Sequence, residues 1–133
     1  MATTKNEQTV TDFFEALSNN DLDKVGKMFH KHATWTVMAQ GIPGAGEHKG
    51  RDNIIKKFIG PIRATFEDGG PRLEVSNVIG KGNVVLAEAV GRGRLKNGKD
   101  YHNLYAWAFE FKGSRINALR EYMDSQYVTT LQD

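Results

Sequence analysis

The sequence has no cysteine, only three prolines and no long apolar run. Without cysteine, the chain can form neither a disulfide framework nor a thiolate nucleophile or metal site. No apolar run approaches the roughly 18–20 residues of a membrane-spanning helix. The first ten residues also lack the basic and apolar regions of a signal peptide. We therefore expect a cytoplasmic protein that does not bind membranes.

The charges are nearly balanced, with 18 basic and 16 acidic residues and a net charge of +2. This balance gives no reason to expect a nucleic acid as partner. No two histidines have a ligand spacing with a carboxylate, so no metal site is predicted. The Gly-Arg-Gly-Arg run at 91–94 opens no predicted helix, so it is not a phosphate loop, and no cofactor is expected. A chain of 133 residues fits one domain, 1–133.

The first half of the chain has the spacing of helices. Apolar residues at helical intervals predict helices over 4–17 and 21–29 and a third one from Arg51 to Phe66, which Pro61 should kink. A strand is expected over 33–39. Residues 40–50 hold four glycines and one proline, which predicts a loop.

The second half of the chain predicts only strands, over 73–79, 84–95, 101–111 and 116–124. Helices followed by an antiparallel meander indicate an α+β fold with helices across the concave face of a curved sheet. Such a cone leaves a cavity between the helices and the sheet. The strand over 101–111 is its expected wall, because its inward face is aromatic and polar rather than aliphatic. That face carries Tyr101, Asn103, Tyr105, Trp107, Phe109 and Phe111.

Two neighbouring strands are predicted to add charged groups to this wall. Alternation after the turn at Gly113-Ser114 places Leu119, Glu121 and Met123 on the inner face, and a slip of one residue would exchange the faces. Asn97-Gly98 predicts a two-residue hairpin turn. That turn would set Glu88 opposite Trp107 and Arg92 opposite Asn103, so both would also face inward.

Several motifs together resemble the SnoaL-like branch of the NTF2-like superfamily. They are Lys49-Gly50-Arg51-Asp52 after the loop, Tyr101-x-Asn103, Phe109-x-Phe111 and the run Arg120 to Asp124. The superfamily includes ketosteroid isomerases, limonene-epoxide hydrolases and polyketide cyclases. The resemblance implies a cone-shaped fold, a pocket and a homodimer formed through the convex sheet.

The resemblance also implies a catalytic position. Glu121 matches a catalytic carboxylate of the limonene-epoxide hydrolases. The Arg and Asp of that family's catalytic triad match Glu88 and Val90 here. The catalytic base of the ketosteroid isomerases, an Asp, falls near Gln40 and Gly41. Neither known catalytic set is therefore complete.

The candidate catalytic residues are Glu121, Glu88 and His48. Two carboxylates in one apolar pocket would raise the pKa of one of them, which suits acid–base chemistry. Each could instead be paired with Arg92 or Arg120 or point to solvent. His48 lies at the expected pocket mouth, where it is a candidate general base. The candidate ligand-binding residues are Trp35, Phe58, Arg92, Tyr101, Asn103, Tyr105, Trp107, Leu119 and Met123.

Two functions remain open at this point. One is a cofactor-free isomerase, cyclase or hydrolase that acts on a small, largely apolar carbonyl or hydroxylated compound. The other is a binding or carrier protein that uses the same pocket without catalysis. A raised pKa of a pocket carboxylate with a free lone pair would favour the enzyme, and carboxylates held by arginine would favour the carrier.

Overall fold

The computed structural model describes residues 4–131, so the first three and last two residues of the predicted domain lie outside it. Its centre is a six-stranded sheet with the order β2-β1-β6-β5-β4-β3. Neighbouring strands are antiparallel except β1 and β6, which are parallel. The sheet is curved and not closed, since β2 and β3 are its edges. The strands are β1 (Phe29–Val37), β2 (Gly46–Lys49), β3 (Arg72–Lys81), β4 (Val84–Arg94), β5 (Asp100–Lys112) and β6 (Arg115–Met123).

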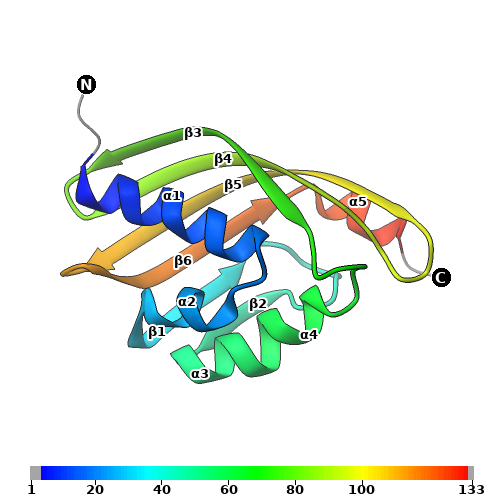
Figure 1. Cartoon of the computed structure of the whole chain (residues 1–133), viewed down its shortest axis with the longest axis horizontal. Helices are drawn as coiled ribbons and strands as arrows, with labels where there is room; N and C mark the ends of the chain where they lie inside the picture. Colours follow the sequence, from blue (N-terminus) through cyan, green and yellow to red (C-terminus); the bar gives the residue numbers. More distant parts are fainter. Residues whose placement is uncertain (1–3, 132–133) are drawn as a thin grey trace.

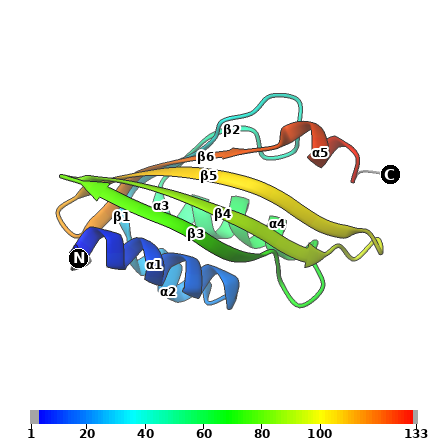
Figure 2. The ribbon, with the colours of Figure 1, turned by 90° about the horizontal axis from the view of Figure 1, so that it is seen from above.

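Helices α1 and α2 lie across one face of this sheet, as Figure 1 shows, and the edge-on view of Figure 2 places them on one side of it. The predicted α+β fold with helices packed on a curved sheet is thereby confirmed. The helices are α1 (Lys5–Ser18), α2 (Leu22–Lys27), α3 (Arg51–Asn53), the π-helix η1 (Ile54–Ile59), α4 (Gly60–Arg63) and α5 (Ser125–Thr129). None of the helices in this described part of the chain is long and apolar enough to cross a membrane.

Helix α1 is fixed at its start and along its buried face. The Thr4 side chain accepts the Glu7 N–H, and the Glu7 carboxylate accepts the Thr4 N–H, which is a capping box. The second oxygen of Glu7 accepts the N–H of Gly80 at 3.0 Å, so the cap also ties α1 to β3. Phe13 and Phe14, at the middle of the helix, are buried against the sheet.

The third predicted helix is interrupted rather than only kinked. Residues Ile54–Ile59 form a π-helix between two short α-helical segments, and the N–H of Gly60 reaches back to the carbonyl of Ile55. Pro61 follows directly and has no N–H to continue the α-helical ladder. This segment carries Phe58, whose ring lies 5.5 Å from that of Trp35 on β1.

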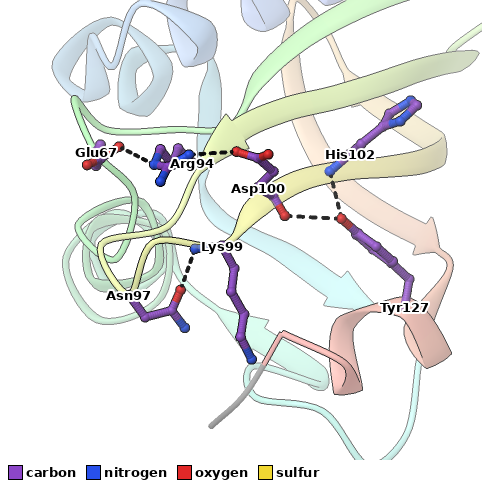
Figure 3. Close-up of polar contacts among 7 residues, drawn as sticks. All are labelled: Glu67, Arg94, Asn97, Lys99, Asp100, His102 and Tyr127. Atoms are coloured by element: carbon purple, nitrogen blue, oxygen red, sulfur yellow. Dashed lines mark hydrogen bonds and ion pairs between the residues drawn. The ribbon is translucent and has the colours of Figure 1, made fainter.

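The hairpin between β4 and β5 has a different register from the predicted one. The N–H of Leu95 donates to the carbonyl of Lys99, so the loop has three residues, with Gly98 at φ +92°. Asn97 accepts the N–H of Lys99 at 3.0 Å and closes this loop. Arg94 therefore pairs with Asp100, and Figure 3 shows their ion pair.

Tyr127 of α5 holds the same register from the other side. Its hydroxyl accepts the N–H of His102 at 3.0 Å and donates to the carbonyl of Asp100 (Figure 3). Because side chains alternate along a strand, the shift of one residue turns each β4 side chain to the face opposite the predicted one.

Some element boundaries also differ from the prediction. The second helix ends at Lys27, and Phe29 already belongs to β1, which ends at Val37 rather than Ala39. The predicted loop 40–50 contains the short edge strand β2. Helix α5, which Asp124 caps through the N–H of Tyr127, was not predicted.

Candidate functional site

A cavity of about 690 Å³ lies between the inner face of the sheet and the helical segment before β3. Strands β1, β5 and β6 contribute its aromatic and carboxylate side, and η1 and α4 contribute an aliphatic side. Most of its wall is apolar, which suits a small molecule with a largely apolar body. The apolar residues of the wall include Val37, Ile42, Pro43, Ile59, Ile62, Leu73, Val128 and Leu131.

Glu121 lies on β6 between Trp107 of β5 and Val37 of β1, and its side chain is buried on the inner face. Trp35 Nε1 donates a hydrogen bond of 2.8 Å to Glu121 Oε1. No other hydrogen bond and no ion pair reaches this carboxyl group from residues 4–131. Burial raises the pKa of Glu121 to about 7, and the Trp35 hydrogen bond opposes that rise. Near neutral pH this carboxyl group can therefore donate or accept a proton.

Two phenols form the next polar group of the wall. The hydroxyls of Tyr101 and Tyr105 lie 2.5 Å apart, and Asn103 Nδ2 donates to the Tyr101 hydroxyl at 3.0 Å. Burial raises the pKa of both phenols, so both stay protonated near neutral pH. One hydrogen bond between two hydroxyls uses one of their two protons. The other proton has no acceptor among the described residues and is available to a ligand.

The indole of Trp107 completes this side of the cavity. Its ring stacks on Tyr105 with the centroids 5.2 Å apart. Trp107 Nε1 is enclosed and has no hydrogen-bond partner among residues 4–131, which is unfavourable for a buried donor. The aromatic rings of this side thus include a donor without a partner among the described residues, Trp107 Nε1.

Seven of the predicted site residues line the cavity together. The alternation of β5 and β6 predicted most of them correctly, because both strands are regular where they face the cavity. The seven are Trp35, Phe58, Tyr101, Tyr105, Trp107, Glu121 and Met123. Their roles in binding or catalysis remain predictions.

The predicted inward orientation of Glu88 and Arg92 is wrong. The three-residue loop after Arg94 sets Glu88 opposite Ala106 and Arg92 opposite His102, so both are exposed on the outer face of the sheet. There Glu88 accepts a hydrogen bond from Asn77, and Arg92 pairs with Glu74. Neither residue lines the cavity.

Three other predicted residues lie beside the cavity rather than in its wall. His48 lies on β2, where its ring stacks on Phe58 at 3.8 Å and its Nε2 donates to the carbonyl of Gly44. Because a carbonyl only accepts, the proton is on Nε2. Asn103 is buried and supports the two phenols, and Leu119 belongs to the core.

Sequence reasoning missed Arg63, which is buried and lines the cavity. Arg63 lies four residues after Ile59 and three before Phe66, so helical spacing places it on their apolar face. That spacing was the signal, but a charged residue in a helix is usually exposed. Among the described residues, no group of three or more histidine or acidic side chains could hold a metal ion.

The sequence matches the model of a known protein family. Residues 10–119 match the family described as SnoaL-like domain, which is most of the chain. No curated protein matches the sequence.

Solved structures share the fold at low sequence identity. An NTF2-like protein of unknown function from Burkholderia pseudomallei is 22% identical, with a TM-score of 0.86 over 97% of this chain and 98% of that one. TerC, co-crystallised with polyporic acid, is 15% identical, with a TM-score of 0.84 over 96% and 98%. A protein with a ketosteroid isomerase-like fold from Catenulispora acidiphila, in complex with trimethylamine, is 21% identical, with a TM-score of 0.73 over 86% and 83%.

Proposed function

Because the chain belongs to the SnoaL-like domain family of the NTF2-like superfamily, we propose that its cavity binds a small, largely apolar molecule and that Glu121 exchanges a proton with it. The structures of TerC with polyporic acid and of the Catenulispora protein with trimethylamine support ligand binding by folds of this type. The proposed reaction is a cofactor-free isomerisation, cyclisation or hydrolysis of a carbonyl or hydroxylated compound.

One observation carries this proposal: Glu121 is a buried carboxyl group without a cationic partner among the described residues. Of the two arginines considered as its partners, Arg92 pairs with Glu74 and Arg120 pairs with Glu110, both away from the cavity. Within residues 4–131, the only group that holds Glu121 is the neutral indole of Trp35. A carboxyl group kept for structure alone would gain from a paired cation, whereas an acid–base group needs a pKa near the working pH.

The phenols supply the second part of the proposed chemistry. When a base removes a proton from the carbon beside a carbonyl, negative charge develops on the carbonyl oxygen. The spare proton of the Tyr101–Tyr105 pair can donate a hydrogen bond to that oxygen. Glu121 then returns the proton to the product, so the net charge of protein and ligand is unchanged.

The proposal predicts that Glu121→Gln binds ligands but does not turn them over. A thermal-shift screen of steroids, terpenoids, polyketides and aromatic acids identifies a ligand, which adds about 2.7 kcal/mol of stability at a hundred times its Kd. We expect wild type to consume it and Glu121→Gln to lose about 10²- to 10⁴-fold in rate with little change in Kd. Glu88→Gln is the matched control and should keep wild-type activity, since Glu88 lies on the outer face. Binding without turnover by wild type would instead establish a carrier.

We also propose that two copies of the chain pair through the outer face of the sheet. Leu86, Leu104 and Tyr122 are exposed there on three adjacent strands. A dimer would remove this apolar surface from water. Light scattering should give twice the monomer mass, and Leu104→Asp should shift the mass to that of a monomer. An unchanged dimer in Leu104→Asp would place the interface elsewhere. The cytoplasm remains the predicted location.

A further inference from the structure

Arg63 is a buried cation in the cavity wall. It is the last residue of α4, and only 3% of its surface is exposed. Burial lowers the pKa of Arg63 to about 10, and the neighbouring Tyr105 opposes this shift, so the guanidinium keeps its charge near neutral pH. No carboxylate of residues 4–131 forms an ion pair with it.

Three hydrogen bonds fix the orientation of the guanidinium, and all three acceptors are neutral. Arg63 Nε donates to Asn20 Oδ1 at 3.1 Å. Nη2 donates to the carbonyls of Pro71 at 2.9 Å and Gly69 at 3.4 Å. These bonds leave the two N–H groups of Nη1 without a partner in the described part of the chain.

The unpaired Nη1 group borders open space. Within residues 4–131, Trp107 Nε1 is the one side-chain nitrogen or oxygen that has neither exposed surface nor a hydrogen-bond partner. Because Nη1 also has no partner, it must keep some exposed surface. Arg63 is almost fully buried and is one of the residues that line the cavity, so the cavity is the space assigned to Nη1. A held guanidinium with two free donors is a preformed site for an anionic oxygen.

We propose that Arg63 binds the carboxylate of an organic acid whose apolar body fills the cavity, with Nη1 donating to an anionic oxygen. This inference rests on the ligand binding proposed above and names the chemical class of that ligand. A buried cation without a partner is unfavourable, and an apolar side chain of similar volume would fill the same space at lower cost. A ligand anion removes this cost on binding, whereas the three neutral acceptors do not.

The other cation of the wall does not offer such a site. Lys96 also lines the cavity, but it lies exposed in the loop between β4 and β5. An exposed ammonium is hydrated and gains little from one more anion. The buried guanidinium is therefore expected to dominate selectivity for an acid.

Matched acid and amide probes test the inference on the wild-type protein. The probes are the carboxylic acids and primary carboxamides of naphthalene, biphenyl, phenanthrene and pyrene, which differ in charge but hardly in shape. By titration calorimetry at pH 8, we expect the best acid to bind at least about tenfold more tightly than its amide. Equal binding, or preference for the amide, would overturn the role of Arg63 and leave the proposed ligand binding intact. No binding by either series would overturn both.

Variants then assign the preference to Arg63. In Arg63→Met the acid should lose its advantage while the amide keeps its Kd, and Arg63→Lys should keep part of the preference. Asn20→Gly removes the acceptor of Nε but not the charge, and Asn20 has φ +58°, which glycine adopts freely. Because it removes one of the three bonds that orient the guanidinium, it should lower the ratio only in part, whereas Arg63→Met abolishes it. An equal loss of affinity for acid and amide in Arg63→Met would mean a structural role only.

Lys96→Gln keeps the inference testable if Arg63→Met does not fold. We expect Lys96→Gln to retain the preference for the acid within about twofold. If Lys96→Gln abolishes the preference, the exposed ammonium is the anion site and the inference is wrong.

Discussion

Phe13→Ala is expected to lower the free energy of unfolding by about 3–5 kcal/mol. Phe13 is fully buried on α1, and its ring centroid lies within about 6 Å of the rings of Phe14, Phe29, Trp35 and Phe109. The residue joins the helical layer to two strands, β1 and β5. Truncation leaves a cavity among rigid rings, which cannot collapse to fill it.

Urea denaturation followed by fluorescence measures this loss. Ile79→Ala is the control, because Ile79 is 68% exposed on β3 and its truncation should change stability by no more than about 0.5 kcal/mol. Phe13 does not line the cavity, so Phe13→Ala should leave ligand Kd nearly unchanged below its melting temperature. A loss below about 1 kcal/mol would show that the aromatic cluster is loosely packed.

The inner face of β5 could be predicted from sequence because a strand has a strict period of two. The β4–β5 ladder runs from Asp100 to Glu110 without a register shift, so one correct assignment of strand fixed the face of every β5 side chain along it. The same reasoning placed Glu121 inside, since its pairing with Trp107 continues the regular part of the β5–β6 ladder. A bulge between Glu110 and Phe111 lies between this pair and the turn and shifts the β6 register by one residue, so a count from the turn alone would have placed Glu121 on the outer face.

The positions of Glu88 and Arg92 depended instead on the length of one loop. Asn97-Gly98 is typical of a two-residue turn, but here it belongs to a three-residue loop. The contacts that select the longer loop come from distant segments: Glu67 pairs with Arg94, and Tyr127 binds the backbone at Asp100 and His102 (Figure 3). Local sequence carries no information on those contacts.

Arg63 shows a different limit of sequence reasoning. Its position on the apolar face follows from helical spacing, but its burial depends on Asn20 and on the carbonyls of Gly69 and Pro71. These acceptors come from the turn after α1 and from the segment before β3, and only the folded chain brings them together. The sequence therefore predicted only one of the two buried charged residues that line the cavity, Glu121 and not Arg63.

The stability of wild type is expected to fall by about 3 kcal/mol between pH 4.5 and pH 8, relative to Glu121→Gln. The pKa of Glu121 is raised from 4.5 to about 7 in the folded protein. Below pH 4.5 the carboxyl group is protonated in both folded and unfolded chains. As the pH rises toward 7, the unfolded chain loses this proton and the folded chain keeps it, so unfolding becomes more favourable. Above pH 7 the folded chain holds a buried anion and the loss is complete.

Glu121→Gln separates this effect from all other titrating groups, because glutamine accepts the Trp35 hydrogen bond and carries no charge. The measurement is the difference in unfolding free energy between the two proteins from pH 4 to pH 8. Glu88→Gln should run parallel to wild type, since Glu88 is exposed. A constant difference between wild type and Glu121→Gln would mean that the pKa of Glu121 is the same in the folded and unfolded chains. That result would remove the observation on which proton exchange by Glu121 depends, while binding in the cavity would still stand.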